Sequence, residues 1–232
     1  MLQTVPGTLT NDHDATSWAK ESYVSTARAF DLLAGHGTRI TVKRGEEIFA
    51  EGDSAESCYR LIEGSIRLVK LMVDGRRQVC EFLKTGDLLG FETDDEYYFS
   101  AEAVSDCTLV RYSRRAVETL LVEDKLFARH VRKVTARGLQ DAYQRMVLLC
   151  HKSAQERIAW FLLDMADRAG IENGYIHLPM TRTDIANYLG MAIETVSRVL
   201  GQLKQNGAII QKSLNRIQLV DRDALELLRG EV

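Results

Sequence analysis

The sequence predicts an α+β protein built from a β-rich first half, one long helix and a small helical unit at its C-terminal end. Short apolar runs alternate with glycine turns up to Tyr112, and an apolar stripe of helical spacing runs from Leu126 to Cys150. Two further helical patterns meet at Gly190. We therefore expect a mobile tail over residues 1–25, a β-roll over 26–122, a long helix over 123–150 and a winged helix-turn-helix over 151–232.

The bulk composition is that of an ordinary globular protein. The chain has 232 residues, of which 45% are hydrophobic and 27% charged, and its formal net charge is −3. No run approaches the roughly 18 apolar residues of a membrane span, and the N-terminus lacks the basic and apolar segments of a secretory signal. We therefore expect a cytoplasmic protein that does not bind a membrane. The small net charge leaves nucleic-acid binding open, because local basic patches decide phosphate contact.

The β-rich half shows strand patterns separated by turn residues. Ser65–Met72 alternates between apolar and polar residues, and Asp74–Gly75 supplies a hairpin turn before Val79–Leu83. A last strand pattern covers Ala101–Tyr112. Many short strands with glycine turns favour a barrel or jelly roll, and an unrelated β-sandwich is the alternative.

The long helix carries an apolar stripe with a period near 3.5 residues. Its members are Leu126, Phe127, Val131, Val134, Leu139, Ala142, Met146 and Leu149. A stripe of this period with charges alongside is typical of a helix that pairs with an identical helix, so we expect a homodimer. The alternative is a helix that packs only on its own β-roll. Gly138 is expected to weaken the helix locally.

The C-terminal unit begins and ends with helix caps. Ser153 and Glu156 form a capping box before an apolar helical run, and Asp221 precedes a last short helix. Between them, Ile209–Ile210 and Ile217–Val220 predict a β-hairpin. This hairpin follows two helices and is expected to be the wing of a winged helix.

The two helices before the wing form a helix-turn-helix pattern. Thr181 and Asp184 predict a capped first helix, and Gly190 allows the sharp turn into the second. The second helix has one apolar face, made by Ile193, Val196, Val199, Leu200 and Leu203.

The opposite face of the second helix suits base readout in the major groove. Arg198 has the geometry to pair with both guanine acceptors, Glu194 to accept from a cytosine amino group, and Ser197 to serve either way. The alternative is an ordinary packed pair of helices with a solvated polar face.

Two features together resemble the CRP/FNR family of bacterial transcription regulators. The run D-I-A-N-Y-L-G is followed by E-T-V-S-R, and glycines at 45, 52, 64, 75, 86 and 90 are spaced like those of a cyclic-nucleotide-binding β-roll. The resemblance implies a homodimer with two recognition helices on a palindromic site in double-stranded DNA. It also implies DNA-backbone contacts near the helix starts, from Thr181, Arg182, Thr183 and Thr195. Ala192 departs from the usual Ser or Thr cap.

The β-roll lacks the effector-binding residues of other members of that family. Phe91 and Phe99 stand where the resemblance places the Glu and Arg that hold a cyclic nucleotide, and only Ser100 remains. No cysteine precedes Cys58, so the N-terminal cysteine cluster of FNR-type members is missing. We therefore expect no cofactor and no metal, as in the FixK type. That type implies an activator of genes for low-oxygen respiration or nitrogen fixation at a site close to TTGAT-N4-ATCAA.

Two sites of further contact or control are indicated. An acidic turn, made by Asp94, Asp95 and Glu96, is where the resemblance implies a contact with RNA polymerase, and a solvated turn is the alternative. Cys150 lies at the end of the long helix, where oxidation would disturb the link between dimer and DNA reader.

Other classes of function fit the sequence less well. An enzyme is not expected, because the chain has no nucleophile motif, no phosphate loop and no His-x-His pair for a metal. A cyclic-nucleotide signalling module is disfavoured by Phe99 and by the recognition helix. The runner-up hypothesis keeps the DNA reader but gates it with a haem, a small effector or cysteine oxidation. His36 and His130 are the conceivable haem ligands.

Overall fold

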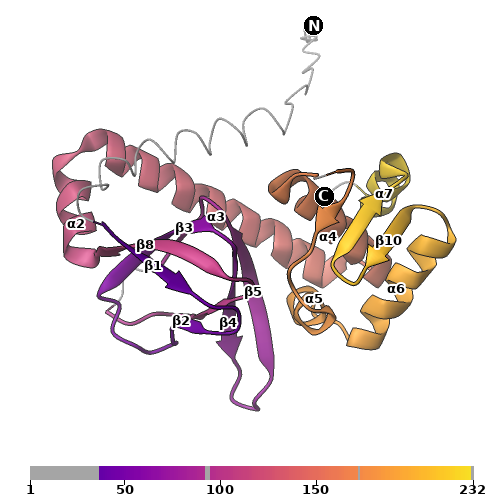
Figure 1. The fold of residues 1–232 in the computed structure, drawn as a ribbon, viewed down its shortest axis with the longest axis horizontal. Coiled ribbons are helices and arrows are strands. Elements are labelled where there is room, and N and C mark those ends of the chain that lie inside the picture. The colour runs from indigo at the N-terminus through magenta and orange to yellow at the C-terminus, as the bar shows by residue number, and fades with distance from the viewer. Residues whose placement is uncertain (1–36, 92–94, 172, 231–232) are drawn as a thin grey trace, which may run out of the picture.

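The computed structural model describes residues 37–91, 95–171 and 173–230. Eight strands form the β-roll in two four-stranded antiparallel sheets, ordered β1-β8-β3-β6 and β2-β7-β4-β5 (Figure 1). The strands are β1 (Gly37–Val42), β2 (Glu47–Phe49), β3 (Ser57–Glu63), β4 (Ser65–Leu71), β5 (Arg77–Lys84), β6 (Leu88–Leu89), β7 (Ser100–Ala103) and β8 (Cys107–Ser113). The described residues do not include the expected tail or the start of the roll with His36. They also do not include Asp94.

The core of the roll lies between the two sheets. Leu61 and Leu109 from one sheet and Ile66 and Ala101 from the other are completely buried. Antiparallel pairing sets this register, since Leu61 faces Leu109 and Ile66 faces Leu83 across neighbouring strands. This agrees with the predicted jelly-roll class.

The strand pattern predicted over Ala101–Tyr112 is divided in the structure. β7 pairs with β4 in one sheet, whereas β8 pairs with β1 and β3 in the other. The chain therefore crosses between sheets at Val104–Asp106, where the Ser105 hydroxyl accepts a hydrogen bond from the Ser65 amide at 3.0 Å. Periodicity alone did not show this break, because apolar residues continue on both sides of it.

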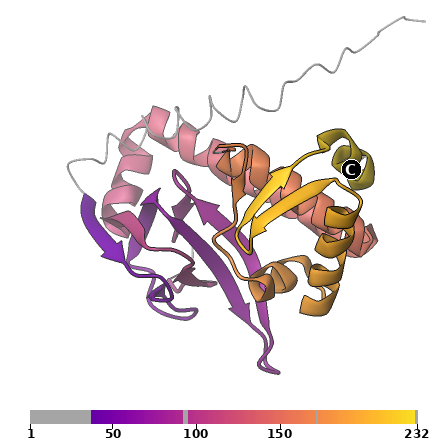
Figure 2. The same ribbon diagram turned by 45° about the vertical axis from the view of Figure 1, so that its right-hand side comes forward.

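Two helices follow the roll, and the second of them is long and uninterrupted. Ser113 caps α2 (Arg114–Glu123), and Asp124 caps α3 (Lys125–His151) by accepting hydrogen bonds from two first-turn amides. At ~1.5 Å per residue, the 27 residues of α3 extend about 40 Å. Gly138 does not interrupt the helix. Figures 1 and 2 show α3 running past both the roll and the C-terminal unit.

The C-terminal unit is a winged helix. It contains α4 (Ala154–Ala169), β9 (Ile176–His177), α5 (Arg182–Leu189), α6 (Ile193–Gln205), β10 (Ile209–Ser213), β11 (Arg216–Leu219) and α7 (Arg222–Arg229). The predicted capping box at Ser153 and Glu156 is present, and Asp221 caps α7. The three strands form a sheet ordered β10-β11-β9. Throughout the described ranges, no helix has the length and apolar character needed to cross a bilayer.

Candidate DNA-binding site

The start of α5 is fixed by a reciprocal capping box. The Thr181 hydroxyl accepts from the Asp184 amide at 3.1 Å and donates to Asp184 Oδ2 at 2.7 Å, while the Thr181 amide donates to the same oxygen at 2.9 Å. Gly190 ends the helix in the left-handed conformation, with φ 60° and ψ 46°, which glycine adopts without steric cost. This turn directs the chain into α6 three residues later.

The two faces of α6 differ in burial as the sequence predicts. Val196, Val199, Leu200 and Leu203 are buried against the rest of the unit. The prediction was wrong for Ile193. This residue is the first of the helix and is 38% exposed, so it does not belong to the buried face. The predicted base-reading residues, Glu194, Ser197 and Arg198, are all exposed. One face of α6 is therefore packed against the rest of the unit, and the opposite polar face is exposed.

The N-terminus of α6 is open. Ala192 provides no side-chain cap, as the sequence indicates, and it is exposed. Its carbonyl accepts from the Thr195 amide at 3.0 Å, but the first amides of the helix have no capping side chain. Unsatisfied amides and the helix dipole make such an end favourable for a phosphate.

The four residues expected to contact the DNA backbone differ in availability. Thr183 is exposed, and Thr195 is half-buried. The Thr181 hydroxyl is already engaged by Asp184. Arg182 is half-buried, and burial lowers the pKa of its guanidinium; its buried Nη1 has no hydrogen-bond partner among the described residues. Thr183 is therefore the best placed of the four for a direct phosphate contact.

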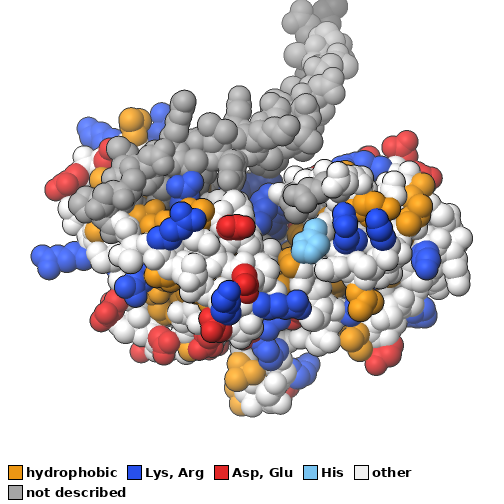
Figure 3. All heavy atoms as spheres, viewed as in Figure 1, with side chains coloured by type: hydrophobic (Ala, Val, Ile, Leu, Met, Phe, Trp, Pro, Cys, Tyr) orange, Lys and Arg blue, Asp and Glu red, His pale blue; other side chains and the backbone are white. Residues whose placement is uncertain are grey.

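Two cations lie on the wing beyond the predicted site residues. Lys212 Nζ and Arg216 Cζ lie 5.4 Å and 5.3 Å from the centroid of the Tyr175 ring, within cation–π range. Nearby, Asn215 and the His177 ring are 3.3 Å apart. Figure 3 shows Lys and Arg side chains over the C-terminal unit and at its junction with the roll. Side chains alternate between the two faces of a strand, so the predicted wing hairpin was the sequence feature from which exposed cations could have been expected.

The predicted dimer stripe on α3 is only partly available to a partner. Leu126 is 74% exposed, Leu139 54% and Met146 56%. Ala142 is also exposed, and three members are half-buried: Val131, Val134 and Leu149. Phe127 corrects the prediction, because it is completely buried in a cluster with Cys58, Tyr112 and Val117. It holds the helix on the roll of its own chain.

Two large exposed apolar residues of α3 are absent from the predicted stripe. Tyr143 is 57% exposed and Val147 37%. Leu139, Tyr143, Met146 and Cys150 are spaced four, three and four residues apart, which is the seam spacing of a two-stranded coiled coil. Cys150 is exposed, whereas Cys58 and Cys107 are buried.

Aromatic side chains fill the inside of the roll. The rings of Phe49 and Tyr97 are stacked with centroids 3.8 Å apart, and Tyr59 lies 5.7 Å from Phe49. The Tyr97 hydroxyl donates to the Ser57 carbonyl at 2.7 Å, and burial raises the pKa of this phenol. The interior is thereby occupied by the protein's own side chains.

The residues at the expected effector anchors have other contacts. Phe91 packs on the cluster around Tyr112 and Val117, and Phe99 makes an edge contact with Tyr98 at 4.8 Å. The Ser100 hydroxyl accepts a hydrogen bond from the Glu51 amide at 3.0 Å.

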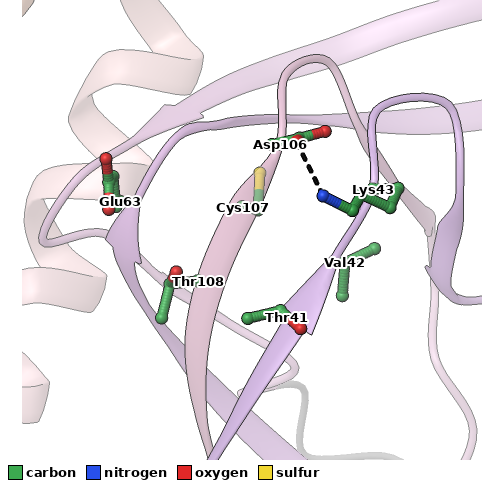
Figure 4. A pocket seen from close by; sticks show the side chains of 7 residues that line it. All are labelled: Thr41, Val42, Lys43, Glu63, Asp106, Cys107 and Thr108. Carbon is green, nitrogen blue, oxygen red and sulfur yellow. Dashed lines mark hydrogen bonds and ion pairs between the residues drawn. The ribbon is translucent and has the colours of Figure 1, made fainter.

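A small pocket lies at the β1–β8 edge of the roll (Figure 4). Its volume is about 200 Å³, and the Lys43–Asp106 ion pair of 3.0 Å crosses its rim. Pockets for small molecules usually measure about 300–1,000 Å³. In the three described ranges, no group of three or more His, Cys, Asp or Glu side chains is placed to hold a metal ion.

The acidic turn is described only in part. Asp95 and Glu96 are exposed, and Glu96 forms an isolated β-bridge with Ser54. Both carboxylates therefore lie at the surface of the described part of the roll.

Comparison with known proteins identifies the class. A cyclic nucleotide-binding domain model matches residues 39–124, and a Crp-like helix-turn-helix domain model matches residues 156–228. The nitrogen fixation regulation protein FixK of Azorhizobium caulinodans is 42% identical over 207 residues, covering 88% of this chain and 84% of that protein. FixK of Rhizobium meliloti is 37% identical, with 84% and 89% covered. The chain belongs to the CRP/FNR family of transcription regulators.

Within this family the chain is of the FixK type. The solved structure of FixK2 from Bradyrhizobium japonicum superimposes with a TM-score of 0.81 at 37% identity, covering 84% of this chain and 98% of that one. A CRP-family regulator from Thermus thermophilus gives 0.71 at 28% identity, with 83% and 97% covered. The predicted fold class, DNA-binding regulator function and FixK type are confirmed.

Proposed function

We propose that this protein is a homodimeric activator that binds a TTGAT-N4-ATCAA-like palindrome without a bound effector and controls genes for low-oxygen respiration or nitrogen fixation. The observation that supports this proposal most directly is the exposed polar face of α6. It bears Glu194, Ser197 and Arg198, while the other face of the helix is apolar and buried. The names of the FixK relatives from Azorhizobium caulinodans and Rhizobium meliloti support the physiological role.

The apolar seam on α3 supports the dimer. Leu139, Tyr143 and Met146 are each more than half exposed in a single chain. Exposed apolar groups in one row along a helix are stabilised when a second copy covers them, and Arg137 and Asp141 flank the row as an ion pair of 3.0 Å. A two-fold axis along this seam gives two α6 helices, which suit half-sites about one helical turn apart.

The filled roll supports activity without an effector. Phe49, Tyr59 and Tyr97 occupy its interior, and the Ser100 hydroxyl already has a partner. A charged phosphate buried there would need a cation at the position of Phe99.

The exposed carboxylates Asp95 and Glu96 are the proposed contact with RNA polymerase. Asp95→Ala combined with Glu96→Ala should leave DNA affinity unchanged and lower transcription from a purified template. Loss of both activities together would contradict this assignment.

Cysteine oxidation is the second candidate for control, because Cys150 is exposed on the same seam. Oxidation of this thiol to a sulfinic acid, beyond the disulfide that mild oxidation forms, would place a charged group between the paired helices. DNA affinity of oxidised protein would then fall, and Cys150→Ser would prevent the fall.

The decisive test of the proposed function is binding of metal-free, ligand-free protein to the palindrome at fixed salt. We expect selective binding over the same duplex with its two guanines changed, since each well-made base contact contributes roughly 1–3 kcal/mol. Equal affinity for the two duplexes would overturn the proposal.

A further inference from the structure

The outer face of the β4–β5 side of the roll is buried against the C-terminal unit. Val69, Val79 and Phe82 of the roll belong to the same buried apolar cluster as Phe161 of α4 and Tyr188 of α5. The Phe82 ring lies 4.9 Å from the Tyr188 ring and 6.5 Å from the Phe161 ring. The two parts of the chain therefore share a packed core at their contact.

Arg67 of β4 bridges the two parts by charge. Its Nη1 lies 2.6 Å from Asp184 Oδ1, and its Nε and Nη2 donate to Glu102 Oε2 at 2.9 Å and 2.6 Å. The side chains of Arg67 and Glu102 are 18% exposed and that of Asp184 9%, so water screens these pairs weakly. Planar guanidinium donors fit this double contact, which a single ammonium does not reproduce.

Asp184 has two roles at once. Its Oδ2 closes the capping box of α5 with Thr181, while its Oδ1 holds Arg67. The first turn of α5 is therefore tied to the roll. Because Gly190 and the shared apolar core fix α6 on α5, the orientation of the reading helix follows that of α5.

Further contacts join α3, the helix of the proposed dimer, to the same interface. Arg145 of α3 pairs with Glu81 of β5 and lies 5.1 Å from the centroid of the Tyr188 ring. Arg168 of α4 reaches Glu81 at 3.1 Å. Gln78 Nε2 donates to the Asn187 carbonyl of α5 at 2.5 Å. The dimer helix, the roll and α5 are thus joined around one strand, β5.

We propose that Arg67 is a positioning residue for DNA recognition: through Asp184 it holds α5 and α6 at a fixed orientation to the dimer helix, so that both reading helices match the half-site separation without an effector. This inference rests on the proposed function, in which a dimer reads a palindrome. The surrounding contacts of Gln78 and Glu81 support the same orientation.

The test compares DNA affinity and spacer preference of full-length wild type and Arg67→Met at one salt concentration. If release leaves about one molecule in ten in the competent orientation, affinity for the N4 palindrome falls about tenfold. Each base pair added to the spacer moves the half-sites ~3.4 Å apart and rotates them by about a tenth of a turn. Wild type should therefore discriminate strongly against N5 and N6, and Arg67→Met should discriminate less.

Two further variants separate positioning from general stability. Lys43→Met removes an exposed cation–carboxylate pair between two loops of the roll, with side chains 73% and 66% exposed. It should behave as wild type. Gln78→Ala removes an independent contact of the same interface and should shift spacer preference in the same direction as Arg67→Met. Hydrogen exchange checks that the variants remain folded. In Arg67→Met and Gln78→Ala, the amides of β1 and β8 should stay protected, while those of α5 should exchange faster than in wild type.

The outcomes are distinguishable. Wild type that fails to prefer the N4 palindrome overturns the proposed function and this inference with it. Selective wild type together with an Arg67→Met variant of equal affinity and equal spacer preference overturns this inference alone. A reduced spacer preference in Arg67→Met and Gln78→Ala, with selectivity for the guanines retained, supports it.

Discussion

Arg198 and Val199 are neighbours in the sequence but differ sharply in exposure on α6. Val199 is 2% exposed and anchors the helix, whereas Arg198 is exposed to solvent. Apolar residues at three- and four-residue steps give the helix a packed apolar face and leave a polar face for reading DNA. At this scale, the identity of single side chains sets which base is read.

Replacing Arg198 by Met should remove selectivity for the guanine without unfolding α6. The expected loss is about 1–3 kcal/mol for each of the two half-sites, or roughly 5- to 150-fold in affinity per half-site. Fluorescence anisotropy on the palindrome and its guanine-changed form measures this difference. Lys204→Met, at the exposed far end of the same helix, is the control and should leave the ratio between the duplexes unchanged. A variant at position 198 that keeps the wild-type ratio would exclude a base contact by Arg198.

At the scale of elements, local signals in the sequence predicted most of the architecture. Caps such as Ser153 and Asp221 and the periodicity of α6 depend on residues three or four positions apart, so they are visible in a single sequence. The division between β7 and β8 is not visible, because pairing with strands far away in the chain decides it. Phe127 matched the dimer stripe, yet its burial depends on Cys58 and Tyr112 of the roll.

Replacing Leu139 by Glu should separate the dimer. A charge at a residue that is 54% exposed in the single chain costs little in the monomer but is buried without a partner in the seam. Sedimentation should show a monomer, and DNA affinity should fall about a hundredfold as the benefit of linked half-sites is lost. Val122→Glu, on α2 at a residue 85% exposed, is the control and should remain dimeric. A dimeric Leu139→Glu protein would place the interface elsewhere.

Cys150 gives an independent test of the seam. In a parallel pair of helices in register, the two Cys150 residues of a dimer face each other at a distance suited to a disulfide. Mild oxidation should therefore produce a covalent dimer on non-reducing gels, and Cys150→Ser should abolish it. Cross-linking that persists in Cys150→Ser would identify Cys80, the half-buried thiol, and contradict the register.

At the scale of the whole molecule, the roll and the DNA reader form one packed body. Arg67 and Asp184 are 117 residues apart in the sequence, so no periodicity or motif indicated their contact. The base-reading residues were predictable because they lie on one helix, whereas the residues that orient this helix come from the roll, α3 and α4. The structure was needed to bring them together.

The charge network around Glu102 predicts a dependence of stability on pH. Burial would raise the pKa of Glu102, but hydrogen bonds from Arg67 and Arg77 outweigh it and lower the pKa below its ordinary value of 4.5. The stabilisation is therefore complete above about pH 4.5 and is lost as the pH falls through the lower, folded value.

Thermal unfolding of wild type and Glu102→Gln between pH 3 and 7 checks this dependence. At neutral pH the variant should melt several degrees lower, since hydrogen bonds to charged groups contribute about 1.5–3 kcal/mol and a chain of this size shifts by about 2–4 °C per kcal/mol. The difference in melting temperature between wild type and variant should become smaller as the pH falls below about 4.5. A gap that does not change with pH would mean that Glu102 is not ionised in this network.

Native mass spectrometry of the purified protein with one palindromic duplex shows whether an effector-free dimer binds the site. We expect a complex of two chains and one duplex with no additional mass, formed in the absence of any added ligand. A complex that forms only with an extra bound mass, or with a single chain on the palindrome, would contradict an effector-free dimeric reader.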